Sequence, residues 1–310
     1  MPNDRRYDKP PLSFDELIRK LSARGLVIPD DGEARHFLSY ISYYRLTGYG
    51  LAFEEFSESG ERLHRYIPGT QFSDLLTVYD VDRCLRILVL DAIERIEVAV
   101  RGVINHKLSC KYDDSHWYMK KNLFKGGDRF SHKNLLDRVS WETGKSSTSS
   151  SDKGEKRERF IRHYYDQYDH PKLPPCWMVG EVLSLGSWSR IYEHLAVSKD
   201  RKAISRCFDL PPPILDSWLH CLTYLRNLCA HHSRLFNRHL TLSPAHHKSV
   251  RFPEKNYFFN YVIVMNWFLR QISPHSSWLE SLHKVMEDLP QPLHCHLGFS
   301  ENARGLLSGA

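Results

Sequence analysis

Apolar residues recur at helical spacing along most of this chain. The longest such stretch runs from Phe72 to Cys110, with charged residues between the apolar ones and no proline or glycine before Gly102. Its apolar members are Leu75, Leu76, Tyr79, Leu88, Ile93, Ile96, Val100 and Val103. Side chains three or four residues apart lie on one face of a helix. We therefore predict one or two long helices in this stretch.

Shorter periodic segments lie on both sides of it. Ser13 and Glu16 form a capping box at the start of a short helix that Gly25 closes. A second helix is expected from about Asp31 to Tyr44, and residues 48–68 allow at most a short hairpin. Further helices are predicted over residues 156–168, 174–195, 214–232, 257–272 and 278–286.

Together these segments predict a predominantly all-α fold, a helical bundle with an N-terminal helical extension and peripheral loops. We assign residues 1–68 to the extension, 69–290 to the helical body and 291–310 to a tail. A run of serine and threonine over 146–151 is low in complexity. It predicts a mobile, basic, serine-rich insertion near residues 140–156.

Composition limits the classes of protein to which the chain can belong. Its 310 residues can bury a substantial core without disulfides or metals. The seven cysteines are odd in number and scattered, which is typical of reduced thiols. The N-terminus has no apolar run for a signal peptide, and no window reaches the length of a membrane span. We therefore expect a cytoplasmic protein that does not contact a membrane.

Positive charge is concentrated in one segment. Between Lys120 and Arg162, twelve Lys or Arg residues stand against six Asp or Glu, and this excess equals the net charge of the whole chain, +6. A basic segment in an otherwise balanced protein indicates either a surface that faces a polyanion or a solvated linker. Lys156, Arg157 and Arg159 are its candidate contacts with a polyanion.

The segment from Tyr224 to Arg238 contains the most informative chemistry, with the sequence Tyr-Leu-Arg-Asn-Leu-Cys-Ala-His-His-Ser-Arg-Leu-Phe-Asn-Arg. Asn227 and His231 are four residues apart and share a helix face, and the long side chain of Arg226 reaches the same area. Arginine holds phosphate oxygens with a charge that it does not lose, and imidazole transfers protons near neutral pH. This combination suits phosphodiester chemistry.

Structural roles stay open for some of these residues. A buried arginine usually pairs with a carboxylate, and Glu97 or Glu94 on the long helix is a plausible partner of Arg226. That role does not exclude catalysis. His232 either packs, supports its neighbour or takes a direct part. Cys229 and His232 are three residues apart, as two metal ligands would be, but no second pair accompanies them. We expect no metal and no cofactor.

The motif also resembles a known family. Arg226 to His231 is similar to the Arg-x(4–6)-His signature of HEPN-domain ribonucleases. The longer string from Arg226 to Arg238 resembles, more narrowly, the Abi family of abortive-infection proteins, the AbiD/AbiF-like group. Other similar blocks are Lys9–Phe14 with Arg24–Leu26, Ile41–Tyr49, Asp82–Arg86, Ile93–Arg101, and Leu173–Met178 with Leu185–Ser187. The likeness extends from about Lys9 to Arg238.

The resemblance implies a HEPN-like bundle and a metal-independent endoribonuclease toxin that defends bacteria against phage. RNA supplies its own nucleophile, the 2′-hydroxyl, so the protein must provide a base, an acid and positive charge. Arg226 would stabilise the transition state, His231 would transfer protons and Asn227 would orient His231. The products would be a 2′,3′-cyclic phosphate and a 5′-hydroxyl. The residues expected to support this site are His232, Glu97 and Arg101.

The resemblance also implies partners. HEPN ribonucleases pair two copies of the motif across a dimer interface, and this chain has one copy, so we expect a homodimer with a composite active site. In related systems a small RNA or a protein restrains the toxin, and the basic segment is a candidate surface for such an RNA. We expect RNA and no DNA as the nucleic acid. The expected RNA contacts are Arg234, Arg238, Tyr44, Arg45, Lys156, Arg157 and Arg159.

Two other functions remain as alternatives. A non-catalytic RNA-binding or sensing module would need the positive charges but not the imidazole of His231. A nucleotide-binding helical scaffold would need a glycine-rich loop around the phosphate, and the sequence has none. Tyr43 and Tyr44 beside Arg45 suit the stacking of unpaired bases, but tyrosines at this spacing also fill helix interfaces.

Overall fold

The computed structural model describes residues 7, 9–127, 130–144 and 158–300. These residues form a predominantly α-helical fold with a small antiparallel hairpin, which confirms the predicted fold class. The elements are α1 (Phe14–Ala23), α2 (Asp31–Ile41), α3 (Tyr43–Gly50), β1 (Glu54–Phe56), β2 (Arg62–Tyr66), α4 (Phe72–Tyr112), α5 (His132–Glu142), α6 (Arg159–Gln167), α7 (Cys176–Val182), α8 (Leu185–Glu193), α9 (Ser198–Ser205), α10 (Pro212–Ala230), α11 (Phe258–Ile272) and α12 (Trp278–Glu287).

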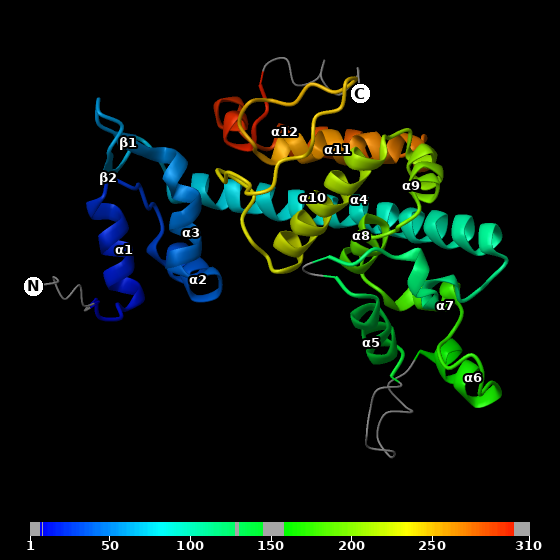
Figure 1. Cartoon of the computed structure of the whole chain (residues 1–310). Helices are drawn as coiled ribbons and strands as arrows, with labels where there is room; N and C mark the ends of the chain where they lie inside the picture. The colour runs from blue at the N-terminus through cyan, green and yellow to red at the C-terminus, as the bar shows by residue number, and fades with distance from the viewer. Residues whose placement is uncertain (1–6, 8, 128–129, 145–157, 301–310) are drawn as a thin grey trace, which may run out of the picture.

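The 41-residue helix α4 is the spine of the molecule. Asp74 caps its start by accepting a hydrogen bond from the backbone N–H of Gln71, at 2.8 Å. Buried residues then recur every three or four positions from Phe72 to Leu108, so one side of α4 faces the core along almost its whole length. At 1.5 Å per residue α4 is about 60 Å long. It runs from the N-terminal elements to the opposite end of the molecule (Figure 1), as one helix where the sequence allowed one or two.

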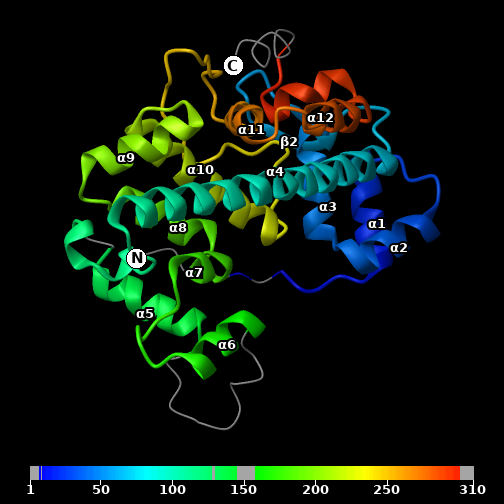
Figure 2. The same ribbon diagram turned by 90° about the vertical axis from the view of Figure 1, so that its right-hand side faces the viewer.

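Helices pack on α4 from different sides. α11 and α12 lie on one side of it and α7 and α8 on the other (Figures 1 and 2), and α10 contacts α4, α8 and α11. Every residue of α11 from Phe258 to Leu269 is buried, as expected of a helix at the centre of a core. The C-terminal end of α10 remains at the surface, which places the motif at the edge of this body.

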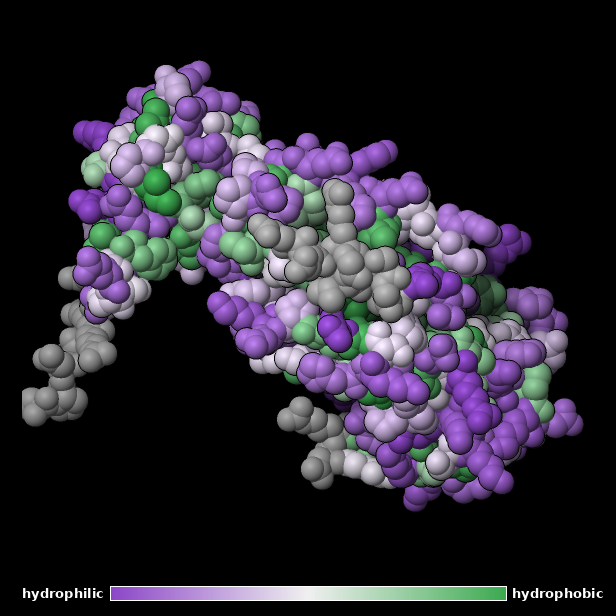
Figure 3. Space-filling model, turned by 90° about the horizontal axis from the view of Figure 1, so that it is seen from above, coloured by the Kyte–Doolittle hydropathy of each residue, from purple (hydrophilic) through white to green (hydrophobic). Residues whose placement is uncertain are grey.

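The N-terminal elements form a module with a core of their own. Its buried residues are Ile18, Leu21, Leu26, Ala34, Leu38, Leu46, Tyr66, Phe72 and Leu75. The last two belong to α4, so the spine begins inside this module and continues into the main core. Seen from above, the module stands out as a lobe at one end of the body, on a face where hydrophilic side chains predominate (Figure 3). The module is therefore joined to the body through α4.

Two predicted helices are interrupted. The helix expected from Asp31 to Tyr44 ends at Ile41, because Ser42 has a φ of 71° and starts α3 by accepting a hydrogen bond from the Arg45 N–H. The helix expected over 174–195 is divided into α7 and α8, because the residues between them are extended. The short helices α5 and α9 are predominantly polar and bury few apolar residues, and they were not predicted.

The regions assigned to an insertion and a tail have different outcomes. Residues 145–157, most of the predicted insertion, lie outside the described residues. Residues 291–300, assigned to the tail, pack on the body, since Leu293 and Leu297 of a 3₁₀ helix (Gln291–Leu297) are buried. Nε2 of His294 also lies 2.8 Å from the carbonyl oxygen of Leu289. This part of the chain therefore belongs to the body.

Candidate functional site

The motif occupies the C-terminal end of α10. Prolines open this helix, where a missing N–H has no intrahelical acceptor to lose. Its buried residues, among them Trp218 and Leu225, face α4, α8 and α11. The helix ends at Ala230, earlier than the predicted His232, because His232 has a φ of 56°. The N–H of His231 still donates to the carbonyl oxygen of Asn227, at 3.0 Å, so these two residues occupy consecutive turns.

The three predicted catalytic residues lie at the surface together. Asn227 and His231 are exposed and Arg226 is half-buried. Nη1 of Arg226 is 3.5 Å from Oδ1 of Asn227, a long contact at the limit of a hydrogen bond. The guanidinium and the amide are thus adjacent and accessible to a substrate.

Glu97 of α4 lies behind Arg226. Burial raises the pKa of the Glu97 carboxyl, while Arg226 and a hydrogen bond from the backbone N–H of Leu185 lower it. No direct ion pair joins Glu97 to Arg226. The predicted carboxylate partner is therefore a neighbour that attracts the guanidinium without holding its donors.

Arg101, a predicted supporting residue, is engaged elsewhere. Its guanidinium donates to the carbonyl oxygen of Gly180, at 3.1 Å, and to the Glu181 carboxylate, at 2.7 Å. Both acceptors belong to α7, so Arg101 joins α4 to α7. It also lowers the pKa of the Glu97 carboxyl, less than Arg226 and Leu185 do. Arg101 therefore influences the motif through Glu97.

The chain that leaves the motif is fixed by a buried carboxylate that sequence reasoning did not assign. Oδ1 of Asp82 accepts the backbone N–H groups of Leu235 and Phe236, at 2.9 and 2.7 Å. Its Oδ2 accepts the hydroxyl of Tyr49, at 2.8 Å, and pairs with Arg86. Burial raises the pKa of Asp82 and these donors lower it. A charged pair four residues apart inside the apolar stripe of α4 was the available signal.

The N-terminal module also reaches the motif. Nη2 of Arg45 donates to the carbonyl oxygen of His232, at 2.6 Å, and its guanidinium lies over the ring of Tyr79. Arg234 lies over the ring of Tyr49, with 5.8 Å from guanidinium carbon to ring centre. The side chain of Tyr44 is 90% exposed. Three of the predicted RNA contacts therefore gather on one side of His231.

Two cavities flank the motif. One, of about 510 Å³, is lined by Tyr44, Arg45 and Arg234 with Arg24 and residues of α3 and the hairpin. The other, of about 670 Å³, lies between α5, α8 and α10 and reaches Asn227. Its polar lining includes Asn134, Arg138, Ser184, Ser187, Arg190, His220 and Tyr224. Sequence reasoning missed these residues, because they come from segments that are far apart in the chain.

The remaining predicted contacts are not placed at the motif. Lys156 and Arg157 lie outside the described residues. Arg159 is the first residue of α6 and is exposed, and it lines neither of the two cavities. Arg238 is half-buried, and its charge lowers the pKa of Arg234. Of the basic residues predicted to bind RNA, the structure therefore brings Arg45, Arg234 and Arg238 together.

Neither a metal cluster nor a membrane-spanning helix is found among the described residues. Among the described residues, no group of three or more His, Cys, Asp or Glu side chains is arranged to hold a metal ion. Cys229 is buried, which raises its thiol pKa to about 12, whereas His232 is exposed, so the two do not share a site. No helix within the described ranges is long and apolar enough to cross a membrane.

Comparison with known proteins identifies a family. The family description "Abi-like protein" matches residues 36–237 of the chain, about two thirds of its length. The matched region begins in α2 and includes α3, the hairpin, α4 and the motif segment as far as Asn237. No curated protein and no solved structure matches the chain.

Proposed function

We propose that this chain, which belongs to the Abi-like family, is a metal-independent endoribonuclease of the HEPN type. The family suggests a role in abortive infection, in which the enzyme would act as a growth-arresting toxin. The observation that supports the chemistry is the placement of Arg226, Asn227 and His231 at an accessible helix end, between two cavities lined with arginines.

The proposed reaction uses the RNA's own 2′-hydroxyl. His231 takes the proton from this hydroxyl while the 2′-oxygen bonds to phosphorus. Arg226 holds the phosphorane oxygens with its paired donors, and Asn227 contacts the phosphate or orients His231. The bond to the 5′-oxygen then breaks, and that oxygen needs a proton. The products are a 2′,3′-cyclic phosphate and a 5′-hydroxyl.

A second copy of the chain would supply that proton. One imidazole cannot accept a proton and donate another in the same step. His220 also lies on α10, but eleven residues from His231, or about 16 Å along the helix. We therefore propose a homodimer in which two copies of the motif share one cleft.

The exposed face of α4 supports such a dimer. Ile87, Leu90 and Val98 are 52%, 36% and 44% exposed on one face of α4, with Asp91 and Glu94 between them. Val98 adjoins Glu97, the residue behind Arg226. Exposed apolar side chains so close to the motif fit an interface between two copies.

A toxin of this kind needs a restraint in its own cell. We propose that a cognate small RNA, or another antitoxin, blocks the two cavities beside the motif. The basic segment between Lys120 and Arg162 would extend this contact. The expected complex is one from which RNA co-purifies with the inactive protein.

Incubation of the purified protein with total RNA in EDTA tests the proposal. The wild type should cleave and leave cyclic-phosphate ends, whereas Arg226→Ala and His231→Ala should not. Arg206→Ala, on the exposed surface near α9, is the matched control and should cleave normally. Equal cleavage by all four proteins would indicate a contaminant and remove the site assignment.

The non-catalytic alternative predicts a different outcome. The arginine-rich cavities favour RNA binding whether or not cleavage follows. If RNA co-purifies, no protein cleaves after its removal, and His231→Ala binds as tightly as the wild type, the chain is a binding module.

A further inference from the structure

The cavity between the N-terminal module and the motif segment has an unusual charge balance. Its ionisable lining residues are Arg24, Arg45, Glu54, Arg62, His64 and Arg234. Four guanidinium groups thus face one carboxylate, an excess of positive charge in a partly enclosed space of about 510 Å³. Cations withdrawn from water are costly unless an anion accompanies them.

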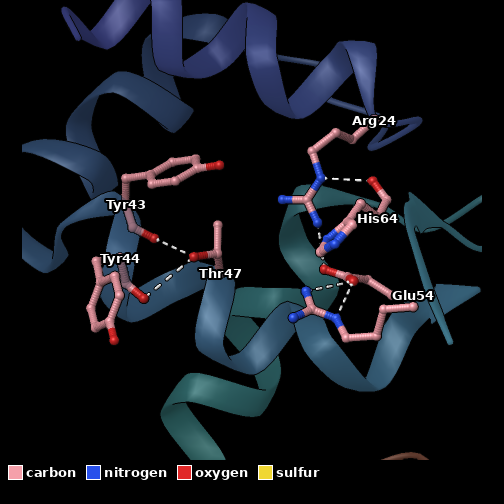
Figure 4. A network of polar contacts seen from close by, with 7 residues as sticks. Arg24, Tyr43, Tyr44, Thr47, Glu54 and His64 are labelled. Carbon is pink, nitrogen blue, oxygen red and sulfur yellow. Dashed lines mark hydrogen bonds and ion pairs between the residues drawn. The ribbon is translucent and has the colours of Figure 1, made fainter. Parts of the chain in front are cut away.

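Glu54 accounts for two of these arginines. Its side chain is 1% exposed and accepts donors from Arg24 and from Arg62, whose Nε and Nη2 lie 2.9 and 2.7 Å from Oε2. Nε of Arg24 also donates to the carbonyl oxygen of His64, at 2.9 Å (Figure 4). One carboxylate therefore holds two cations in place, and the cavity keeps its positive excess.

Arg234 has no such partner. Its Nη1 is buried and has no hydrogen-bond acceptor among the described residues. Arginine stays charged even where burial lowers its pKa, so a buried donor without an acceptor is unfavourable. A side chain at Gly48 would begin 3.2 Å from Nη1, so the glycine lets this atom lie close against α3. Arg234 still lines the cavity, where its positive charge attracts an oxyanion.

The cavity is continuous with the motif. Arg45 lines it and donates to the carbonyl oxygen of His232, while Arg234 is three residues after His231. Tyr44 lines it with a ring that is 90% exposed. Guanidinium groups beside an exposed aromatic ring suit a single strand of RNA, whose phosphates bind the cations and whose bases stack on the ring.

We propose that this cavity is a substrate subsite that binds an RNA phosphate next to the cleaved one, with Tyr44 stacked on the adjoining base. The proposal rests on the proposed function, because it takes RNA as the substrate. Phosphate oxygens bind Arg234 where it lines the cavity. The strand then passes His231 and continues towards the cavity at Asn227. The N-terminal module is thereby a substrate-positioning element.

Binding of a fluorescent eight-residue oligouridine to the His231→Ala protein tests the subsite without cleavage. Arg234→Gln and Tyr44→Ala, each added to this protein, should weaken binding roughly tenfold. Arg234→Gln should also lower the slope of log affinity against log salt by about 0.7, the value for one phosphate contact on a single strand. Tyr44→Ala removes no charge and should leave the slope unchanged.

Matched controls separate the cavity from general effects. Arg206→Gln makes the same charge change on the surface near α9, and Tyr40→Ala removes a ring that is 81% exposed on α2. Neither residue lines the cavity, and both variants should bind as the parent does. Circular dichroism checks the fold. If Arg234→Gln is unfolded, the highly exposed Tyr44 decides the outcome.

Unchanged affinity in Tyr44→Ala and in folded Arg234→Gln overturns the subsite. A second result would also overturn the subsite. If 5′-AMP binds the wild type but not Arg234→Gln, and oligonucleotide binding is the same in both, the cavity serves a free mononucleotide. The proposed nuclease can fail independently. If the cavity variants bind RNA more weakly but the wild type does not cleave, the nuclease proposal fails and the RNA subsite stands. If the wild type cleaves but the cavity variants bind RNA unchanged, the subsite fails and the nuclease proposal stands.

Discussion

Two clusters of polar side chains meet at the end of α10 and differ in how their hydrogen-bonding groups are used. In the first, Asp82 is 1% exposed and accepts two backbone N–H groups, a hydroxyl and a guanidinium. In the second, Asn227 and His231 face solvent beside Arg226, whose contact with Asn227 is 3.5 Å long. The first cluster holds the chain in place, and the second leaves its groups available for a ligand.

The largest expected effect comes from breaking the first cluster. Asp82→Ala leaves the buried guanidinium of Arg86 and two backbone N–H groups without their acceptor. Loss of one partner of a buried ion pair costs about 3–5 kcal/mol. Urea unfolding should show this loss, and cleavage should fall with it. Asp82→Asn keeps an oxygen for Leu235 and Phe236 and should lose less, and equal losses would contradict the role of those N–H groups.

The converse variant acts on the second cluster. His231→Ala should lower the cleavage rate roughly 10²–10⁴-fold, as expected for a proton-transfer group. Its free energy of unfolding should change by less than about 0.5 kcal/mol, because the side chain is exposed. His232→Gly suits the left-handed backbone there and should keep most activity. Large instability in His231→Ala would show that the second cluster is also structural.

The same contrast explains how much the sequence could predict. The fold class and the long helix were predictable, because apolar spacing along α4 is a local property of the chain. The motif was predictable because Arg226, Asn227 and His231 lie within two turns of one helix. Their distance from Glu97 was only partly predictable, since it depends on how α4 packs against α10.

The rest of the site depends on contacts between distant segments. Asp82 meets Leu235 across more than 150 positions of sequence, and Arg45 meets His232 across nearly 190. Neither spacing leaves a periodic signal. The break at Ser42 was also hidden, because its positive φ depends on the packing of α2 and α3. Such features emerge only when the module and the body are assembled.

A third prediction asks whether the exposed cluster is completed by a second copy. A tenfold excess of the His231→Ala protein should lower cleavage per wild-type chain roughly tenfold. A mixed dimer then holds only one of the two imidazoles that the shared cleft needs. If each chain carries an independent site, the excess leaves cleavage by the wild type unchanged.

The interface itself can be tested with matched variants. Val98→Asp places a charge at an exposed apolar position of α4 and should shift the protein from dimer to monomer in size-exclusion chromatography with light scattering. Val27→Asp makes the same change at a residue with the same 44% exposure in the N-terminal module. The Val27→Asp protein should remain a dimer. A monomeric wild type that still cleaves would remove the composite site.

The smallest expected effect concerns Glu97, which lies between the two kinds of cluster. Burial raises the pKa of its carboxyl above the usual value of 4.5, and Arg226 opposes the shift. Because the folded state then holds the proton more tightly than the unfolded state, the free energy of unfolding should decrease as pH rises above 4.5 through the raised pKa. Glu97→Gln should remove this decrease. Arg226→Ala should extend it to higher pH, since the opposing charge is gone.

Carboxyl NMR titration of Glu97 measures this directly. Its pKa should be higher in Arg226→Ala than in the wild type. The control is Arg95→Ala, which removes a cation from α4 that pairs with Asp91 and is not among the influences on Glu97. An identical Glu97 pKa in all three proteins would mean that Arg226 and this carboxylate do not interact electrostatically. The orientation of the guanidinium would then depend on Asn227 and on the bound phosphate alone.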